Sequence, residues 1–294
     1  MTLKPFPLAI VAGTLAFFLA AAGQARAQAA PDAQTAFAER SALLAADSRC
    51  QLLRAEERAA IVAAAAQARG ALLRGGWTGT RVDALRSRAT AAGQARACDD
   101  PALRQSAAQA QAGYEGWSRM TQMRFPGTHS AWSARRVPDA QGFMLRQEGR
   151  GGTVLGVRYT ENGPVATLTA PLAAQSPAPG FGAISFRDSA RAPSSLADVP
   201  GRGTTLAALV APPAMARVVF ATQLSVETDE EGRRFAVVTF PQSAFAAIAG
   251  LDPREAIEVR LGREPGVRGV SLVFEVGDLA AAQAFLLARP VADS

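Results

Sequence analysis

The chain of 294 residues has only two cysteines, Cys50 and Cys98, and both lie in its most helix-prone part. Residues 37–120 consist largely of Ala, Leu, Arg and Gln, which all favour the α-helix. Apolar residues recur there at steps of three and four, which is the spacing of one helix face. The spacing predicts buried stripes on three successive segments: Ala60, Ile61, Ala64, Ala68 and Leu72; Val82, Leu85, Ala89 and Ala92; Leu103, Ala107, Ala110, Tyr114 and Trp117. We therefore expect a bundle of three or four short helices.

Local signals at the ends of these segments divide the bundle into separate helices. The glycine pair at 75–76 is predicted to end one helix, because glycine is favoured just after a helix. Thr80, with Asp83 three residues later, predicts a capping pair at the start of the next. Asp100 followed by Pro101 predicts an N-cap residue and a first helical residue.

The N-terminus has the pattern of a secretory signal peptide. Lys4 supplies the positive charge, residues 6–22 form an apolar core, and the small-x-small triplet at 25–27 is a cleavage site. We predict that residues 1–27 are removed and that the mature chain begins at Gln28. The apolar core is too short for a membrane anchor, so the protein is expected in the periplasm or outside the cell.

Export bears directly on the two cysteines, because thiols normally pair in an oxidising compartment. We therefore expect a disulfide between Cys50 and Cys98. Closing a loop of that length should stabilise the fold by about 4 kcal/mol. The alternative is a pair of buried free thiols. No transmembrane span is expected in the mature chain.

The charge of the chain is unevenly distributed. Every positive side chain after Lys4 is an arginine, which binds carboxylates and phosphates through two nitrogens at once. Residues 121–226 carry 10 arginines against 5 acids, whereas residues 227–294 carry 7 against 11. A basic middle favours an anionic envelope component, such as an acidic lipid or polysaccharide, or an envelope protein. Nucleic acid is not expected as a partner, because the positive charges are spread out and form no basic run.

From about residue 123 the sequence takes on the alternating pattern of β-strands. Asn162-Gly163 between two such segments, 153–160 and 165–169, is a strong signal of a β-hairpin. Further strands are predicted at 142–148, 181–186, 217–226, 235–240, 256–261 and 270–276. Helices are predicted at 241–249 and from the capping residue Asp278 to about residue 289. Strands joined by tight turns pair antiparallel, and both helices have one apolar side, so they should cover one face of the sheet.

The predicted fold class is therefore α+β. A helical domain at 28–122, stapled by the disulfide, precedes an antiparallel α+β domain at 123–294. Within the second domain, residues 171–205 are rich in Pro, Ser, Gly and Ala and predict an irregular segment.

Two segments near the C-terminus carry a family resemblance. Residues 243–253 (SAFAAIAGLDP) and 271–282 (SLVFEVGDLAAA) resemble the end of small secreted bacterial proteins of the invasion-associated-locus-B type. The resemblance implies that a short helix, a strand pair and a last helix close a β domain, and it implies no catalytic residues. The whole chain is also similar to the uncharacterised secreted proteins common in bacterial genomes.

Several enzyme classes are excluded by residues that the mature chain lacks. Without lysine it can form no Schiff base, no P-loop and no Ser-Lys nucleophile. One histidine and two paired cysteines provide too few ligands for a structural zinc site. No Gly-x-Gly-x-x-Gly follows a strand, so a dinucleotide fold has no support. We predict neither a metal nor a cofactor.

His129 is the remaining candidate for acid–base catalysis, in a loop where the two halves of the chain join. A secreted hydrolase would pair it with a serine and orient it with an acid, such as Asp139, but Ser130 is its neighbour in sequence and is not placed across a site from it. The sequence has no Gly-x-Ser-x-Gly nucleophile elbow, so a solvated histidine is the favoured interpretation.

The junction of the two domains is where we expect a ligand groove, because clefts favour domain interfaces. The candidate lining residues are Trp117, Phe125, His129, Trp132 and Arg135. The sequence therefore predicts an exported, soluble, non-enzymatic protein that binds a ligand or maintains the envelope. A secreted hydrolase that uses the His129 loop is the alternative.

Overall fold

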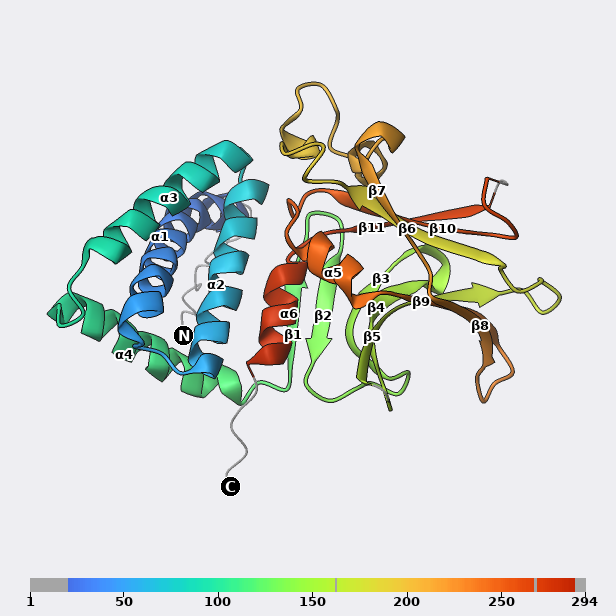
Figure 1. Ribbon diagram of the computed structural model, residues 1–294, viewed down its shortest axis with the longest axis horizontal. Helices are drawn as coiled ribbons and strands as arrows, with labels where there is room; N and C mark the ends of the chain where they lie inside the picture. Colours follow the sequence, from blue (N-terminus) through green and yellow to red (C-terminus); the bar gives the residue numbers. More distant parts are fainter. Residues whose placement is uncertain (1–20, 162, 267–268, 289–294) are drawn as a thin grey trace, which may run out of the picture.

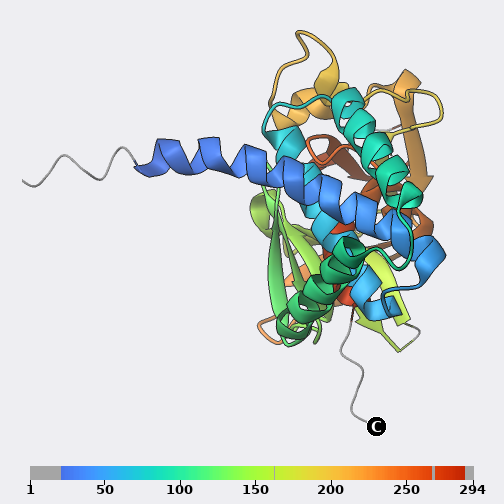
Figure 2. The ribbon, with the colours of Figure 1, turned by 90° about the vertical axis from the view of Figure 1, so that its left-hand side faces the viewer.

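The structure, a computed structural model, describes residues 21–161, 163–266 and 269–288, with side chains from residue 33 onward. Residues 1–20 of the predicted signal peptide lie outside this part, and residues 21–27 belong to the first helix. Four helices come first: α1 (Ala21–Cys50), α2 (Ala55–Arg74), α3 (Gly79–Ala95) and α4 (Pro101–Ser118). Helix α1 packs against both α2 and α3, and α4 crosses their ends (Figures 1 and 2).

The disulfide between Cys50 and Cys98 is confirmed, with the two Cα atoms 5.5 Å apart. It joins the end of α1 to the segment that follows α3. Most of the predicted apolar stripes face inward, and Leu72, Val82 and Leu103 are each at most 2% exposed. The inward placement of Ala92 is wrong, because Ala92 is exposed and the neighbouring Gly93 is buried. The α+β fold class with disulfide-linked N-terminal helices is therefore confirmed.

Of the two predicted N-cap residues, one is confirmed and the other is wrong. Asp100 caps α4, because its carboxylate accepts hydrogen bonds from the backbone N–H of Ala102 and Leu103. The prediction of Thr80 as the cap of α3 is wrong. Thr78 takes that role and accepts from the N–H of Arg81, so Thr80 is already inside the helix.

The strands form two antiparallel sheets, where we predicted one (Figure 1). The seven-stranded sheet has the order β1 (Gln122–Pro126), β2 (Ala131–Arg135), β3 (Phe143–Glu148), β4 (Val154–Thr160), β5 (Gly163–Leu172), β9 (Arg234–Phe240) and β8 (Gln223–Thr228). The four-stranded sheet has the order β11 (Val270–Glu275), β10 (Ala256–Gly262), β6 (Phe181–Arg187) and β7 (Ala216–Phe220). Their inner faces share one apolar core, to which Leu168, Ile184 and Val259 contribute.

The single strand predicted at 217–226 is in fact two strands. The chain leaves the four-stranded sheet after Phe220 and enters the seven-stranded sheet at Gln223. The apolar run at 218–221 extends past Phe220, and neither Ala221 nor Thr222 is a glycine or proline that would mark the break. The crossing therefore has no local signal.

Helices α5 (Gln242–Ala249) and α6 (Leu279–Leu287) pack against the seven-stranded sheet, and α6 also lies along α2 (Figure 1). The ring of Phe285 is 5.1 Å from that of Trp117 and 5.8 Å from that of Phe125, measured between centroids. Asp278 precedes α6 as predicted, but its carboxylate binds Arg74 of α2 at 2.7 and 2.9 Å instead of capping the helix. Helix α6 thus joins the helical bundle to the sheet.

Buried charges hold the segment between β6 and β7 against the rest of the fold. This segment contains the short 3-10 helices η2 (Leu196–Asp198), η3 (Leu206–Leu209) and η4 (Pro213–Met215), and a further one, η1 (Arg150–Gly152), precedes β4. Arg187 and Glu255 form an ion pair at 2.8 Å with both side chains at most 5% exposed. Arg254 binds both Asp198 and Asp252 at 2.7 Å.

Asp252 should make stability depend on pH on the acid side. Burial raises its pKa, but the hydrogen bonds and charge of Arg254 outweigh burial and hold that pKa below its ordinary value of 3.8. A lowered folded-state pKa gives stability that is present above the unfolded pKa and is lost as pH falls through the folded value. Asp252→Asn should therefore cost about 2 kcal/mol at pH 7 and flatten the decline in unfolding free energy below about pH 4.

Urea unfolding measured from pH 7 down to pH 2.5 checks this expectation. Arg254→Gln removes the partner and should flatten the same part of the curve. If the unfolding free energy of Asp252→Asn fell with pH as steeply as that of the wild type, the Asp252–Arg254 pair would not be the source of the pH dependence.

Candidate functional site

The outer face of strands β1, β2 and β3 carries a row of polar side chains. Arg124 on β1 is opposite Ser133 on β2, which is in turn opposite Arg146 on β3. Side chains alternate between the two faces of a strand, so the residues next to this row point inward. Phe125 and Trp132 on the inner face are fully buried. The sheet therefore separates a polar outer surface from the core.

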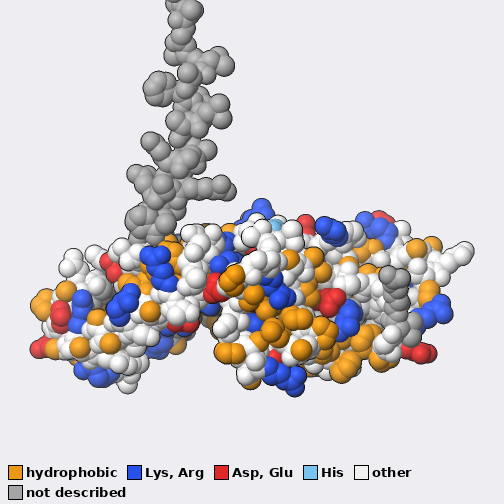
Figure 3. Space-filling model, turned by 90° about the horizontal axis from the view of Figure 1, so that it is seen from above, with side chains coloured by type: hydrophobic (Ala, Val, Ile, Leu, Met, Phe, Trp, Pro, Cys, Tyr) orange, Lys and Arg blue, Asp and Glu red, His pale blue; other side chains and the backbone are white. Residues whose placement is uncertain are grey.

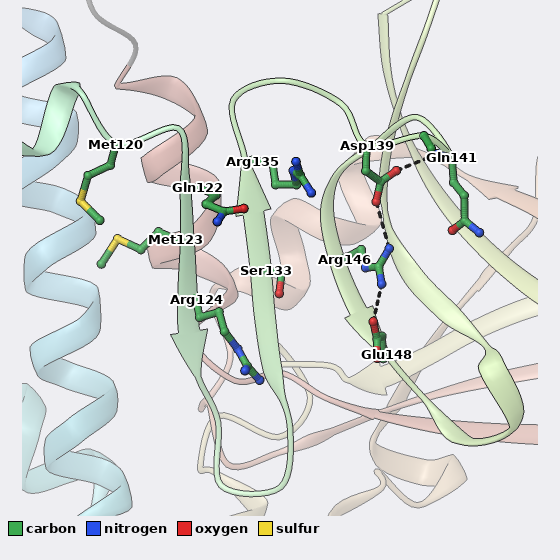
Figure 4. Close-up of a pocket in the computed structure, with 11 residues that line it drawn as sticks. Met120, Gln122, Met123, Arg124, Ser133, Arg135, Asp139, Gln141, Arg146 and Glu148 are labelled. Carbon is green, nitrogen blue, oxygen red and sulfur yellow. Dashed lines mark hydrogen bonds and ion pairs between the residues drawn. The ribbon is translucent and has the colours of Figure 1, made fainter.

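This outer surface forms a shallow groove of about 710 Å³ (Figure 4). Arg124, Ser133 and Arg146 lie across it, and Arg135 lies near its upper end in the view of Figure 4. The other lining residues are Met120, Gln122, Met123, Asp139, Ala140, Gln141 and Glu148. Hydroxyl, amide and guanidinium groups thus share one open surface.

One of the three arginines is already held by acidic side chains. Arg146 binds Asp139 at 3.0 Å and also pairs with Glu148 (Figure 4). The hydrogen bond with Glu148 raises the pKa of Arg146 despite partial burial, so its charge is firmly retained. Asp139 also accepts hydrogen bonds from the backbone N–H of Gln141 and Phe143, both at 2.9 Å. Both acids of the groove are therefore engaged with Arg146.

Arg124 and Arg135 are both exposed. Within the described residues, their side chains form no hydrogen bond or ion pair. Because the two acids of the groove are engaged with Arg146, these two guanidinium groups leave it with a net positive charge. An arginine presents a planar set of donors that matches a carboxylate or a phosphate. The surface is therefore suited to anionic ligands.

The five residues predicted to line a junction groove do not share one. Phe125 and Trp132 lie in the core, and Trp117 is half-buried against Phe285 of α6. Arg135 is on the opposite face of the sheet, in the groove of Figure 4. The two-residue period of β2 places Trp132 and Arg135 on opposite faces, whereas our prediction treated this stretch as a loop.

His129 is exposed in the turn between β1 and β2, and the one histidine is visible at the surface in Figure 3. Its ring Nε2 lies 3.0 Å from the carbonyl oxygen of Thr204. Asp139 follows the far end of β2 and so lies away from this turn. The acid that does reach the turn is the fully buried Glu275, which accepts backbone N–H groups rather than the imidazole. This arrangement brings together no Ser-His-acid set.

The turn itself is fixed by that buried carboxylate. The backbone N–H groups of Thr128, His129 and Ser130 donate to Glu275 at 2.6, 2.7 and 2.9 Å. Gly127 approaches it so closely that a Cβ there would lie 2.5 Å from Oε2 of Glu275. Glu275 therefore holds the connection between the two strands that carry Arg124 and Arg135.

Comparisons with known proteins were made for the whole chain. No family model, curated protein or solved structure matches it. The likeness of the C-terminal segments to invasion-associated-locus-B-type proteins stays a prediction.

Within residues 21–161, 163–266 and 269–288, no three His, Cys, Asp or Glu side chains are grouped to hold a metal ion. No helix in the described part of the chain has both the length and the hydropathy of a membrane span.

Sequence reasoning missed most of the groove, although a signal was present. Gln122 and Arg124 alternate with apolar neighbours on one strand, and Ser133 and Arg135 do so on the next. This pattern predicts two half-buried strands with one polar face. To predict these strands, the Pro-Gly pair at 126–127 had to be assigned to the start of a turn that joins two strands.

Proposed function

We propose that this chain is an exported, non-enzymatic binding protein of the bacterial cell envelope, and that the groove on β1–β3 binds an anionic polysaccharide. The observation that carries the proposal is the pair of unpaired arginines, Arg124 and Arg135, beside Ser133 on an open polar surface. Export is supported by the N-terminal pattern, and a disulfide fits the oxidising space outside the cytoplasm.

The geometry favours an extended ligand over a small ion. Neighbouring strands are about 5 Å apart and residues two positions apart along a strand are about 7 Å apart. The backbones of Arg124 and Arg135 are therefore separated by roughly 8 Å, which suits a ligand with more than one anionic group. Gln122, Ser133 and Gln141 add amide and hydroxyl groups that can bind sugar hydroxyls.

Binding to polygalacturonate tests the proposal, with neutral dextran as the uncharged control. The double variant Arg124→Gln/Arg135→Gln should weaken polygalacturonate binding about tenfold or more at low salt, because each arginine provides a charge-assisted hydrogen bond. The matched variant Arg88→Gln/Arg104→Gln changes the net charge equally at two exposed sites on α3 and α4. It should bind nearly as well as the wild type.

Two outcomes would contradict the proposal. Equal loss in both double variants would mean that net charge, rather than the groove, attracts the polymer. Binding to phosphatidylglycerol vesicles but not to polygalacturonate would identify a lipid surface as the partner instead.

Export is tested separately in cells that produce the full chain. The mature protein should be recovered outside the cytoplasm, with Cys50 and Cys98 resistant to an alkylating reagent until a reductant is added. An intact precursor in the cytoplasm with two reactive thiols would contradict this part of the proposal.

A further inference from the structure

A second cleft lies between the helical bundle and the β-sandwich, on the other side of α2 from α4. Its volume is about 600 Å³. Helices α1, α2 and α3 form one wall, and the loop after α5 together with the start of α6 forms the other. Phe37, Leu44, Val62 and Leu251 make much of this lining apolar. The volume is in the range of pockets that bind small organic ligands.

Two arginines from different helices reach this cleft. Arg69 of α2 is half-buried and donates one hydrogen bond, at 3.2 Å, to the carbonyl oxygen of Leu251. Arg86 of α3 lies with its guanidinium carbon 5.7 Å from the centre of the Phe37 ring. The cleft thus combines an apolar lining with two guanidinium groups.

Neither of these arginines is held in a close ion pair within the described residues. Among the described residues Arg69 forms no ion pair, and Arg86 has only a loose, exposed one at 3.7 Å to Asp83. Asp278 also lines the cleft, but Arg74 already occupies both of its carboxylate oxygens. Burial lowers the pKa of Arg69 and the charge of Arg86 lowers it further, whereas the charges of Asp252, Asp83 and Glu255 oppose this. A ligand anion in the cleft would give the half-buried Arg69 a direct ionic partner.

We propose that this cleft binds an amphipathic monocarboxylate, such as a fatty acid. The carboxylate lies between Arg69 and Arg86, and the hydrocarbon chain lies along Leu44, Val62 and Leu251. This site is separate from the arginine groove on β1–β3, because the two have no lining residue in common. The ligand would contact both the helical bundle and the loop after α5, so binding would also hold the two parts together.

Titration calorimetry with dodecanoate and the full mature chain tests the proposal. Arg86→Gln should weaken binding about tenfold, because it removes a hydrogen bond between two charged groups. Arg88→Gln changes an exposed arginine of the same helix that does not line the cleft and should leave the affinity unchanged. Arg69→Lys, which keeps the charge but not the planar donor set, should weaken binding less than Arg86→Gln does.

Controls separate this site from the one on the sheet. The double variant Arg124→Gln/Arg135→Gln should bind dodecanoate with the affinity of the wild type, whether or not its binding to polygalacturonate is weakened. Absence of dodecanoate binding, equal binding of the uncharged dodecanol, or equal affinities of Arg86→Gln and Arg88→Gln would each overturn the proposal.

Discussion

Replacing both cysteines with serine should lower the free energy of unfolding by about 4 kcal/mol. The disulfide spans 48 positions, and losing it restores the conformational freedom of that loop to the unfolded chain. The bundle has little to offset this loss, because many of its buried contacts are made by alanines such as Ala46, Ala63 and Ala68. Each alanine buries far less apolar area than a leucine. Urea unfolding followed by circular dichroism gives the measurement.

Reduction provides the matched control for this variant. Dithiothreitol should destabilise the wild type by a similar amount and have no effect on Cys50→Ser/Cys98→Ser. A double variant as stable as the oxidised wild type would mean that the bundle does not depend on the bridge.

Glu275→Ala should destabilise the protein by about 4 kcal/mol, because three backbone N–H groups lose a charged acceptor. These donors come from the turn between β1 and β2, and the carboxylate that they share is fully buried. Gln147 holds the backbone of Glu275 itself through two hydrogen bonds, at 2.8 and 3.0 Å. Removing the side chain therefore leaves polar groups unpaired in a site that is otherwise tightly packed.

Two further variants show whether the carboxylate itself is responsible. Glu275→Gln keeps one acceptor oxygen and should cost less than Glu275→Ala. Glu258→Ala, on the neighbouring strand, removes a partly exposed carboxylate that accepts from Ser185 and Ser271 and lies 3.7 Å from Arg260, and should cost about 1 kcal/mol. Equal losses in Glu275→Ala and Glu258→Ala would contradict our account of the turn. Polygalacturonate binding should also fall more in the first variant, since this turn joins the strands of the groove.

The helical bundle was predictable because its signals are local. The stripe through Leu103, Ala107 and Tyr114 repeats within a single helix, and so no distant partner is needed to recognise it. The misplaced start of α3 shows the limit of this reasoning. Thr78 and Thr80 are both acceptable caps by type, and only the course of the chain after α2 decides between them.

The β part was less predictable, because its organisation depends on pairing between distant segments. The sequence predicts most strands, including the β4–β5 hairpin, but contains no signal that β6 pairs with β10 while β5 pairs with β9. The groove depends on the same kind of information. Arg124 and Arg146 become neighbours across Ser133 only when β1, β2 and β3 have paired in register.

The position of α6 has a consequence for biosynthesis. Arg74 and Asp278, which join α2 to the start of α6, are 204 positions apart, and the ribosome makes α6 after every other helix and strand described here. The emerging chain can form local helices early, but the surface of α2 that α6 covers stays open until translation is nearly complete. A chain released before α6 would present this surface to proteases. For the export that we propose, a chain that still lacks α6 has an incomplete core, and this would favour its passage through a narrow channel.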